Sequence, residues 1–421
     1  MDLKLIAEVF MRKITAVLLA IALSCGAVFA KGDYGTAGEF LNWGAGARSM
    51  GMGKAFTGLA DDPSAIYYNP AGLALQNPLQ VTAQHVFLFE DTFFDFGAVT
   101  YPVSGIGTFA LSFIGLTSLN YDYRDALWNE TFDDFAVLQQ AYVLSYARDI
   151  FSWLAAGMNF KLVNETVFDA TSIGYGLDIG LMFTPSDIIS FGLSVMNVLP
   201  ANMKLSQQAE YLPITIKFGA ALKLFGERII PVLDMEQELS GKDFKFRMGI
   251  ELYPIQQVAV RAGLDETELT FGLGAYFKPY RVDYSLAYQE LGFSHRVSFT
   301  LAFGGFDVNL AAEPKIFSPV GTKKNTTISI YAVTKYPIVE WELNILNEDG
   351  DVVRSYSGDE KTPQFVVWDG KDDRGLPVSD GEYKCIMKVK DKNKREFESN
   401  RETVKISSSI PTQPGSIRFD E

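Results

Sequence analysis

The feature that most constrains this chain is an alternation of large apolar residues with small or polar ones, which runs from Leu79 to Gly304. In the segment 269–277, for example, Leu269 and Phe271 alternate with threonine and glycine. A repeat of two residues places like side chains on one face of a β-strand, whereas a helix repeats every 3.6 residues. The region therefore predicts strands with one large apolar face and one small, polar or charged face.

Fourteen such segments can be counted. They begin near Leu79, Phe93, Gly105, Phe135, Trp153, Thr171, Ile188, Leu212, Arg228, Asp243, Gln256, Thr267, Tyr280 and Phe293. Each segment has about 16 residues, enough for the ~10 residues of a tilted membrane-crossing strand and a turn. Bacterial outer-membrane barrels have an even number of strands. We therefore predict an all-β fold over 79–304, a fourteen-stranded antiparallel transmembrane β-barrel. A soluble β-sandwich would also alternate, but it explains less well why many polar-face positions are glycine or serine.

The connections between these segments support the barrel independently. Tight turns follow the even-numbered segments, several of them at prolines, namely Pro102, Pro185, Pro254 and Pro279. Longer, acidic loops are expected after odd-numbered segments, notably at 115–134, 197–211 and 236–243. Short turns on one rim and long loops on the other are typical of the periplasmic and extracellular sides of such barrels.

The first thirty residues predict a secretory signal peptide. Arg12 and Lys13 precede an apolar run that ends in an Ala-x-Ala site before Lys31, which is the pattern of a cleaved signal. Met11 is an alternative start. Lipidation at Cys25 and a retained membrane anchor are the other interpretations, although the apolar run is shorter than the ~20 residues that span a bilayer.

Composition limits the chemistry that this protein can perform. The formal net charge is −14, and an acidic chain without a basic cluster is a poor partner for nucleic acid. The two histidines are far apart in sequence, and after signal cleavage one cysteine, Cys385, is left. No nucleophile motif, metal-ligand spacing or dinucleotide-binding motif is found, so we expect no enzyme activity, no cofactor and no metal site.

Residues 31–78 lie between the signal and the first strand and have no apolar core of their own. Their glycines permit tight backbone turns. The strings RSMGMG at 48–53, ADDPSA at 60–65 and YYNPAGL at 67–73 resemble the start of the PorV/PorQ family, relatives of the FadL-type outer-membrane transporters of long-chain fatty acids. The resemblance implies a hatch inside the barrel. The resemblance identifies Arg48, Asn69, Pro70, Ala71 and Gly72 as the motif residues of this hatch.

Several charged residues fall on the predicted inward face. Two interpretations stay open: they pair within the lumen and anchor the hatch, or some line a path for an amphipathic solute with a carboxylate or similar head. With Arg48, the candidates for that path are Lys217, Arg247 and Arg261, with Met182 and Met196 as its apolar lining.

Near residue 305 the composition changes. From there on, 37 of 117 residues are charged, against 51 of the first 304, which indicates a second, soluble domain over 305–421. Short strands are predicted at 326–332, 340–346, 352–356, 365–368 and 384–390. The turn motif between the last two is Trp368, Asp369, Gly370, Gly375, Gly381 and Tyr383. It is similar to the Ig-like domain of the flagellar hook-capping protein family, a small β-sandwich. A calcium loop is the alternative, but Lys371 and Arg374 stand where calcium ligands or glycine are needed.

Two functions from different classes follow. The first is passive uptake of hydrophobic or amphipathic small molecules through an outer-membrane barrel, with membrane lipid and a hydrophobic ligand as partners. The second is a non-transporting component of protein secretion or surface assembly, as some PorV-type proteins are, with residues 305–421 docking periplasmic or secretion-system proteins. With an even number of strands both barrel ends lie on the short-turn rim, so the hatch and the C-terminal domain are expected on the periplasmic side.

Overall fold

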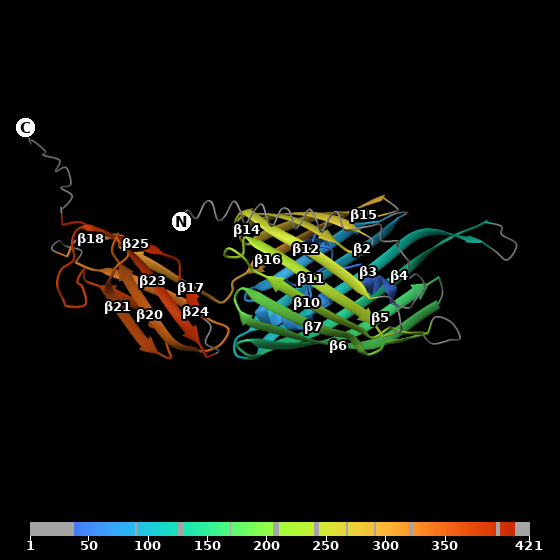
Figure 1. Cartoon of the computed structure of the whole chain (residues 1–421), viewed down its shortest axis with the longest axis horizontal. Helices are drawn as coiled ribbons and strands as arrows, with labels where there is room; N and C mark the ends of the chain where they lie inside the picture. Colours follow the sequence, from blue (N-terminus) through green and yellow to red (C-terminus); the bar gives the residue numbers. More distant parts are fainter. Residues whose placement is uncertain are drawn as a thin grey trace, which may run out of the picture.

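The computed structural model describes residues 38–408 except 89–90, 125–129, 169, 205–209, 240–243, 267, 290–291, 320–323 and 393–395. The predicted signal peptide lies outside the described residues. Two bodies follow one another along the long axis, a barrel and a smaller β-domain (Figure 1). None of the helices in the described part is long and apolar enough to cross a membrane.

The barrel is a closed antiparallel sheet of fourteen strands, as predicted. Its strands are β1 (Leu79–Phe87), β2 (Thr92–Val103), β3 (Gly107–Arg124), β4 (Glu130–Phe151), β5 (Leu154–Val167), β6 (Ala170–Ser186), β7 (Ile189–Leu199), β10 (Thr215–Leu222), β11 (Ile229–Glu238), β12 (Lys245–Ile255), β13 (Val258–Leu264), β14 (Leu269–Phe277), β15 (Tyr280–Gln289) and β16 (Gly292–Phe303). Each strand pairs with its neighbour in sequence. The sheet closes because β1 pairs with both β2 and β16, for example Leu79 with Phe303.

The alternation sorts side chains between the two sides of this wall. On β14 the outward Leu269, Phe271 and Leu273 are 46%, 50% and 56% exposed, whereas the inward Thr270 is fully buried. Exposed large apolar side chains recur on every side of the barrel. Such a surface is unfavourable in water and is suited to lipid, and most of the small and polar residues of the strands face the lumen.

The connections differ between the two rims. The tight turns follow β2, β4, β6, β10, β12 and β14, and all lie on the rim from which the chain continues into the C-terminal domain. The prediction of a loop at 115–134 was wrong. In that stretch β3 continues to Arg124 and β4 begins at Glu130, with Tyr121 paired to Phe135. This hairpin projects from the end of the barrel opposite the C-terminal domain (Figure 1). A loop was predicted because the stretch is rich in acidic residues, but the two strands remain paired within it.

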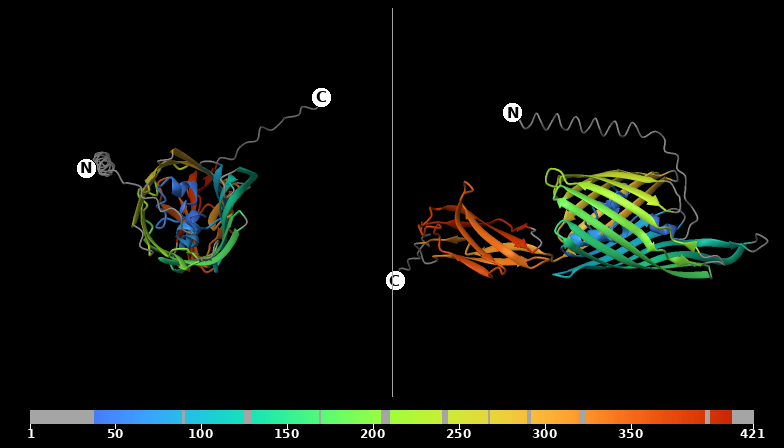
Figure 2. Two further views of the ribbon diagram at one scale, coloured as in Figure 1. Left: turned by 90° about the vertical axis from the view of Figure 1, so that its right-hand side faces the viewer. Right: turned by 60° about the horizontal axis from the view of Figure 1, so that its bottom comes forward.

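Residues 38–78, named the hatch below, lie inside the barrel. Figure 2 shows them in blue within the ring of strands. The hatch consists of short turns of helix, η1 (Glu39–Asn42), α2 (Ala47–Met50), α3 (Ala65–Tyr68) and η2 (Pro70–Leu75). Nearly all of its residues from Ala45 onward are buried. On the rim away from the C-terminal domain, β8 (Asn202–Met203) and β9 (Glu210–Tyr211) form a two-stranded ladder after β7.

The C-terminal domain, named the tail below, packs two sheets over one apolar core. The smaller sheet contains β17 (Asp307–Glu313), β19 (Thr326–Val333) and β22 (Phe365–Trp368). The larger contains β18 (Ile316–Phe317), β20 (Ile338–Leu346), β21 (Val352–Asp359), β23 (Gly381–Asp391), β24 (Glu396–Glu398) and β25 (Glu402–Ile406). The five predicted strands are present. Strands β17, β18, β24 and β25 were not predicted; of these, β18 and β24 have only two and three residues.

Candidate functional site

The hatch touches the barrel wall through its own backbone, and glycines on the inward faces of the strands make this possible. A Cβ atom at Gly192 would overlap the carbonyl oxygen of Thr57, and one at Gly263 would overlap the backbone of Met52 and Gly53. The same kind of contact is made at Gly157, Gly219 and Gly249, whereas a Cβ at Gly180 would overlap the side chain of Asn69. Small inward residues predict space for something to pack inside. That space is filled by the hatch of the same chain.

Polar side chains on the wall hold the hatch backbone. The carboxylate of Asp234 on β11 accepts hydrogen bonds from the backbone N–H groups of Phe56 and Thr57, at 2.9 and 2.8 Å. The amide of Asn159 on β5 donates to the carbonyl oxygen of Ile66 at 2.8 Å. These two wall residues were not singled out from the sequence. Their inward place in the alternation is the signal that would have found them.

The motif at 69–72 forms the corner of the hatch. The Asn69 amide donates to the carbonyl oxygens of Thr57 in the hatch and Leu181 in the wall, at 3.1 and 3.0 Å. Its side-chain oxygen accepts from the N–H of Ala71 and caps η2, where Pro70 occupies the first turn. Asn69 thus joins two parts of the hatch to strand β6.

Gly72 lies against another part of the hatch. A Cβ there would overlap the carbonyl oxygen of Ala60, so a larger residue would push the segments around Ala60 and Gly72 apart. The motif residues therefore shape and anchor the hatch in this structure.

Arg48 stands at the centre of a buried ionic network. Its guanidinium contacts Glu251 on β12 through two nitrogen–oxygen pairs, at 2.9 and 2.7 Å, and also pairs with Asp61 of the hatch. The same Glu251 accepts from Nε of Arg261 at 2.7 Å, and Arg261 reaches Asp283 at 2.8 Å. A buried charge is tolerated only when it is paired, so each group in this network depends on the others.

A second network lies around Arg247 on β12. Its guanidinium donates to Asp265 and Glu236, at 2.9 and 2.5 Å, and Lys217 lies 3.4 Å from the same Glu236 carboxylate. Lys54 of the hatch joins this network through Asp265, at 2.9 Å. The four predicted basic residues are therefore brought together in the lumen, each with a carboxylate partner. Their assignment to a solute path stays a prediction.

The two predicted methionines also face inward. Met182 is fully buried, and Met196 lines a cavity of about 30 Å³ together with Lys217. A cavity of about 10 Å³ lies beside Arg48. Such volumes hold about one or two waters. With the hatch in this position, neither of these two cavities has room for a solute.

A larger space opens at the short-turn rim. A cavity of about 810 Å³ lies between Leu59 and Asp61 of the hatch, Trp153 of the β4–β5 turn and Phe397 of the tail. It is lined by polar and apolar groups and is continuous with the outside. We call it the vestibule.

The tail contacts both the barrel and the hatch through the turn between β19 and β20. Lys335 of this turn is 1% exposed, and its ammonium group donates to the carbonyl oxygen of Ala74 at 2.6 Å and to the hydroxyl of Thr108 at 3.0 Å. The Lys335 carbonyl accepts from the N–H of Gly105 at 2.7 Å. Because Ala74 belongs to the hatch, one tail residue joins all three parts of the chain. No sequence pattern had marked it.

The predicted turn motif of the tail is part of its fold. Trp368 is buried between Phe317 and Tyr383, and its indole N–H donates to the carbonyl oxygen of Lys371 at 3.0 Å. Gly370 and Gly375 have φ angles of 73° and 79°, which favour glycine. Gly381 begins β23, and Asp369 lies beside Lys371.

Asp372, within this turn, uses its carboxylate to close the loop. It accepts from the N–H groups of Leu376 and Arg374, at 2.8 and 2.9 Å. These hydrogen bonds hold the pKa of Asp372 below its ordinary value, and the one from Leu376 has the largest effect. In the described part of the chain, no group of three or more His, Cys, Asp or Glu side chains is placed to hold a metal ion.

The two histidines, far apart in sequence, lie on adjacent strands. His85 on β1 and His295 on β16 are brought together by barrel closure, with Phe87 directly opposite His295. Both face outward. His85 lies 2.7 Å from Asp95, and His295 lies 2.8 Å from the hydroxyl of Tyr284. Their proximity depends on a pairing between the first and last strands, which sequence distance cannot indicate.

Comparison with known proteins gives one family match and several similar folds. Residues 318–393 match the model of the FlgD Ig-like domain, which agrees with the prediction for the tail. Among curated proteins, none matches this chain.

Three of the solved structures that resemble the chain are the toluene transporter TbuX of Ralstonia pickettii, the toluene transporter TodX of Pseudomonas putida and a FadL homologue of Pseudomonas aeruginosa. Their sequence identities are 14%, 12% and 11%, and their TM-scores 0.47, 0.46 and 0.45. Each match covers 62% of this chain, and 99%, 96% and 98% of the respective relative. The barrel fold is established by the strand pairing described above and does not depend on these similarities.

Proposed function

We propose that the chain is an outer-membrane protein that allows passive uptake of hydrophobic or amphipathic small molecules. In this proposal residues 31–78 are the hatch, 79–304 the membrane barrel and 305–421 a periplasmic domain. In this proposal the barrel belongs to the PorV/PorQ family, which the resemblance of the hatch motif supports. The observation that carries the proposal is a lipid-compatible barrel whose lumen is filled by a separate segment, which contacts the wall through hydrogen bonds and ion pairs as well as through an apolar cluster.

Polar contacts suit a segment that has to move. The carboxylates and amides that hold Phe56, Thr57 and Ile66 can exchange their partners for water when the lumen hydrates, at a small net cost per hydrogen bond. Movement of the hatch toward the vestibule would open a path past Arg48, Arg247 and Arg261, which could then face a carboxylate of the solute.

An uptake measurement tests the proposal. Cells that contain the full chain are expected to accumulate a radiolabelled fatty acid or toluene faster than cells that lack it. A looser hatch, as in Glu251→Gln, should raise the rate further. Lipid extraction and mass measurement of the purified protein should yield an apolar ligand at about one per chain. Equal uptake with and without the protein, and no bound apolar compound, would contradict the transport function.

A second candidate function is a component of protein secretion or surface assembly. The observation that favours it is the contact of Lys335 with Ala74 and Thr108, since the tail is positioned on the barrel mouth and could dock a partner there. Purification that yields stoichiometric periplasmic or surface proteins bound to the tail, without an apolar ligand, would favour this function. In either case the tail should be protected from protease in intact cells.

A further inference from the structure

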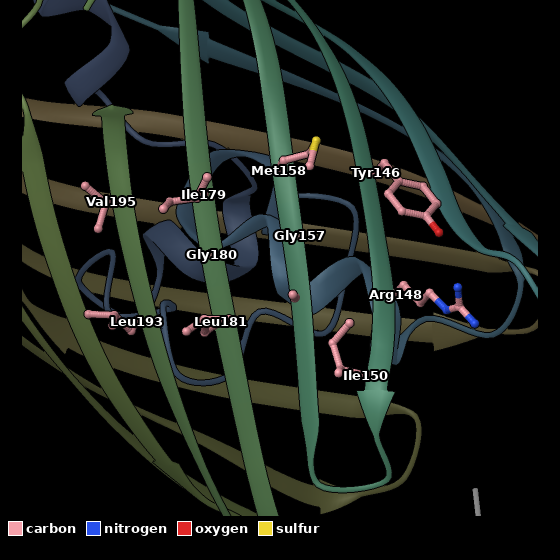
Figure 3. Close-up of a pocket in the computed structure, with 11 residues that line it drawn as sticks. Tyr146, Arg148, Ile150, Gly157, Met158, Ile179, Gly180, Leu181, Leu193 and Val195 are labelled. Atoms are coloured by element: carbon pink, nitrogen blue, oxygen red, sulfur yellow. The ribbon is translucent and has the colours of Figure 1, made fainter. Parts of the chain in front are cut away.

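The outer wall of the barrel has a hollow that the proposed transport function does not use. It measures about 460 Å³ and lies on four neighbouring strands, β4 to β7. Its sides are formed by Met158, Ile179, Leu181 and Leu193, which are 40–51% exposed. Figure 3 shows them around the Gly157–Gly180 pair. The volume falls within the range of small-molecule sites.

The hollow exists because small residues interrupt the large outward ones. Ala156, which alternates with Met158 on the lipid-facing side of β5, lines it. Gly157 and Gly180 form its floor and pair with each other across β5 and β6. Behind them, inside the lumen, lies Pro70 of the hatch. The floor is therefore fixed by packing on the other side of the wall.

A single cation stands beside this apolar surface. Arg148 on β4 lines the hollow and is exposed. Among the described side chains of the barrel strands, it is the one lysine or arginine on the outward face, since the others, such as Lys161 and Arg247, point into the lumen. Its guanidinium has no hydrogen bond or ion pair to another described residue, in contrast to the lumen arginines.

The depth of Arg148 in the membrane follows from its neighbours. It precedes the end of β4, at Phe151, by three residues, which is roughly 8 Å along the membrane normal for a tilted strand. Phe151 and Trp153 stack at 5.2 Å on the short-turn rim, where aromatic residues mark the membrane interface. Arg148 thus lies near the boundary between headgroups and acyl chains, where an unpaired charge in a membrane protein indicates a functional site.

We propose that this hollow is a binding site for one anionic phospholipid of the membrane leaflet at the short-turn rim. Arg148 binds the phosphate, for which a guanidinium offers two parallel donors. One acyl chain lies over Ala156, between Met158 and Leu181. The inference rests on the membrane placement proposed above, and it concerns the outer wall alone.

The test uses the full chain, purified in a neutral detergent, and native mass spectrometry with added phosphatidylglycerol or phosphatidylcholine. The wild-type protein is expected to retain one phosphatidylglycerol more tightly than phosphatidylcholine. Arg148→Gln should weaken phosphatidylglycerol binding roughly tenfold, as expected for the loss of a charge-assisted hydrogen bond. Ala156→Leu, which fills the hollow without changing the charge, should weaken the binding of both lipids.

Lys278→Gln is the matched control, because Lys278 is exposed in the β14–β15 turn on the same rim and lies outside the hollow. It should bind as the wild type does. Unchanged retention in Arg148→Gln and Ala156→Leu, or an equal loss in Lys278→Gln, would overturn the site. Barrel folding of each variant is checked by the migration of unheated protein on a gel. Failure of the folded barrel to insert into vesicles would instead count against the membrane placement.

Discussion

The lumen of the barrel and the core of the tail differ in the charge that they bury. The tail core is apolar, with Trp368, Leu343 and Met387 fully buried. The barrel buries charged groups beside an apolar cluster of hatch and wall residues, with Glu251 and Arg261 at 0% and 1% exposure, and leaves most of the large apolar residues of its wall outside. Both regions use the same two-residue alternation. The difference teaches that the surrounding solvent, lipid or water, decides which face of a strand is turned inward.

The largest effects are expected where each kind of interior is broken. Glu251→Gln leaves Arg48 and Arg261 without their shared carboxylate, and breaking a buried ion pair costs about 3–5 kcal/mol. Trp368→Ala empties the tail core at a similar cost of about 3–5 kcal/mol. Proteolysis and thermal unfolding should show hatch release in the first variant with an intact tail, and an unfolded tail with an intact barrel in the second. Loss of both regions in either variant would contradict two separate interiors.

The glycine contacts should give the next largest effect. Gly263→Ala places a methyl group into the backbone of Met52 and Gly53, and overpacking of this kind costs about 1–3 kcal/mol. Gly97→Ala is the matched control in the same barrel, since a Cβ there has one neighbour, at 3.9 Å. Hatch accessibility to protease should rise in the first variant and stay at the wild-type level in the control. Equal behaviour would show that the hatch packs less closely than described.

The contact between tail and barrel is expected to contribute less to the fold of either region. Lys335→Met removes the hydrogen bonds to Ala74 and Thr108, at a cost of about 1.5–3 kcal/mol for a charged donor. Protease should then cleave the connection near residue 305 faster, while both regions keep their folds. Lys361→Met, at an exposed position of the tail, should leave the cleavage rate unchanged. A similar rate in both variants would mean that Lys335 does not hold the regions together.

The smallest effect concerns pH. Burial, followed by the nearby carboxylate of Glu402, raises the pKa of the Cys385 thiol from 9.0 to about 12. The folded tail therefore keeps this proton where the unfolded chain loses it. Its stabilising contribution is complete below about pH 9 and declines as the pH rises toward 12.

Urea unfolding of the tail followed from pH 8 to 11 checks this prediction. The slope of stability against pH should be less steep in Cys385→Ala, whatever its stability at pH 8. An identical slope in the two proteins would contradict a perturbed thiol. In the wild type, alkylation of Cys385 at pH 8 should also be slow until the tail unfolds.

Much of the fold could be predicted because its signals are local. The strand starts at Leu79, Trp153 and Tyr280 follow from alternation and turns, and they lie within a residue of the observed strands. The charged residues of 115–134 misled the prediction, since a stretch rich in acidic residues is more typical of a loop than of a strand. The short strand β17 was missed because nothing near Asp307 shows which sheet it joins.

The sequence predicts which basic residues face the lumen, but it does not predict which carboxylates they pair with. Arg48, Arg247 and Arg261 are identifiable as inward cations from their place in the alternation. That Arg48 shares Glu251 with Arg261, 213 residues away from it in the chain, depends on where the hatch turns lie against β12 and β13. The role of Asp234 as acceptor for Phe56 and Thr57 depends on the same placement.

The sequence by itself determined the strand count, the lipid-compatible face and the presence of a segment to fill the lumen. A two-residue repeat can be recognised from adjacent residues alone, without knowledge of distant contacts. The tertiary structure alone decided which charges pair, how the inward glycines receive the hatch backbone, and that His85, His295 and Lys335 meet distant parts of the chain. The contacts within the barrel follow from barrel closure and strand register, and those of Lys335 from the packing of the tail against the barrel. Closure and register are set by the whole sheet at once, so no single segment of the sequence carries them.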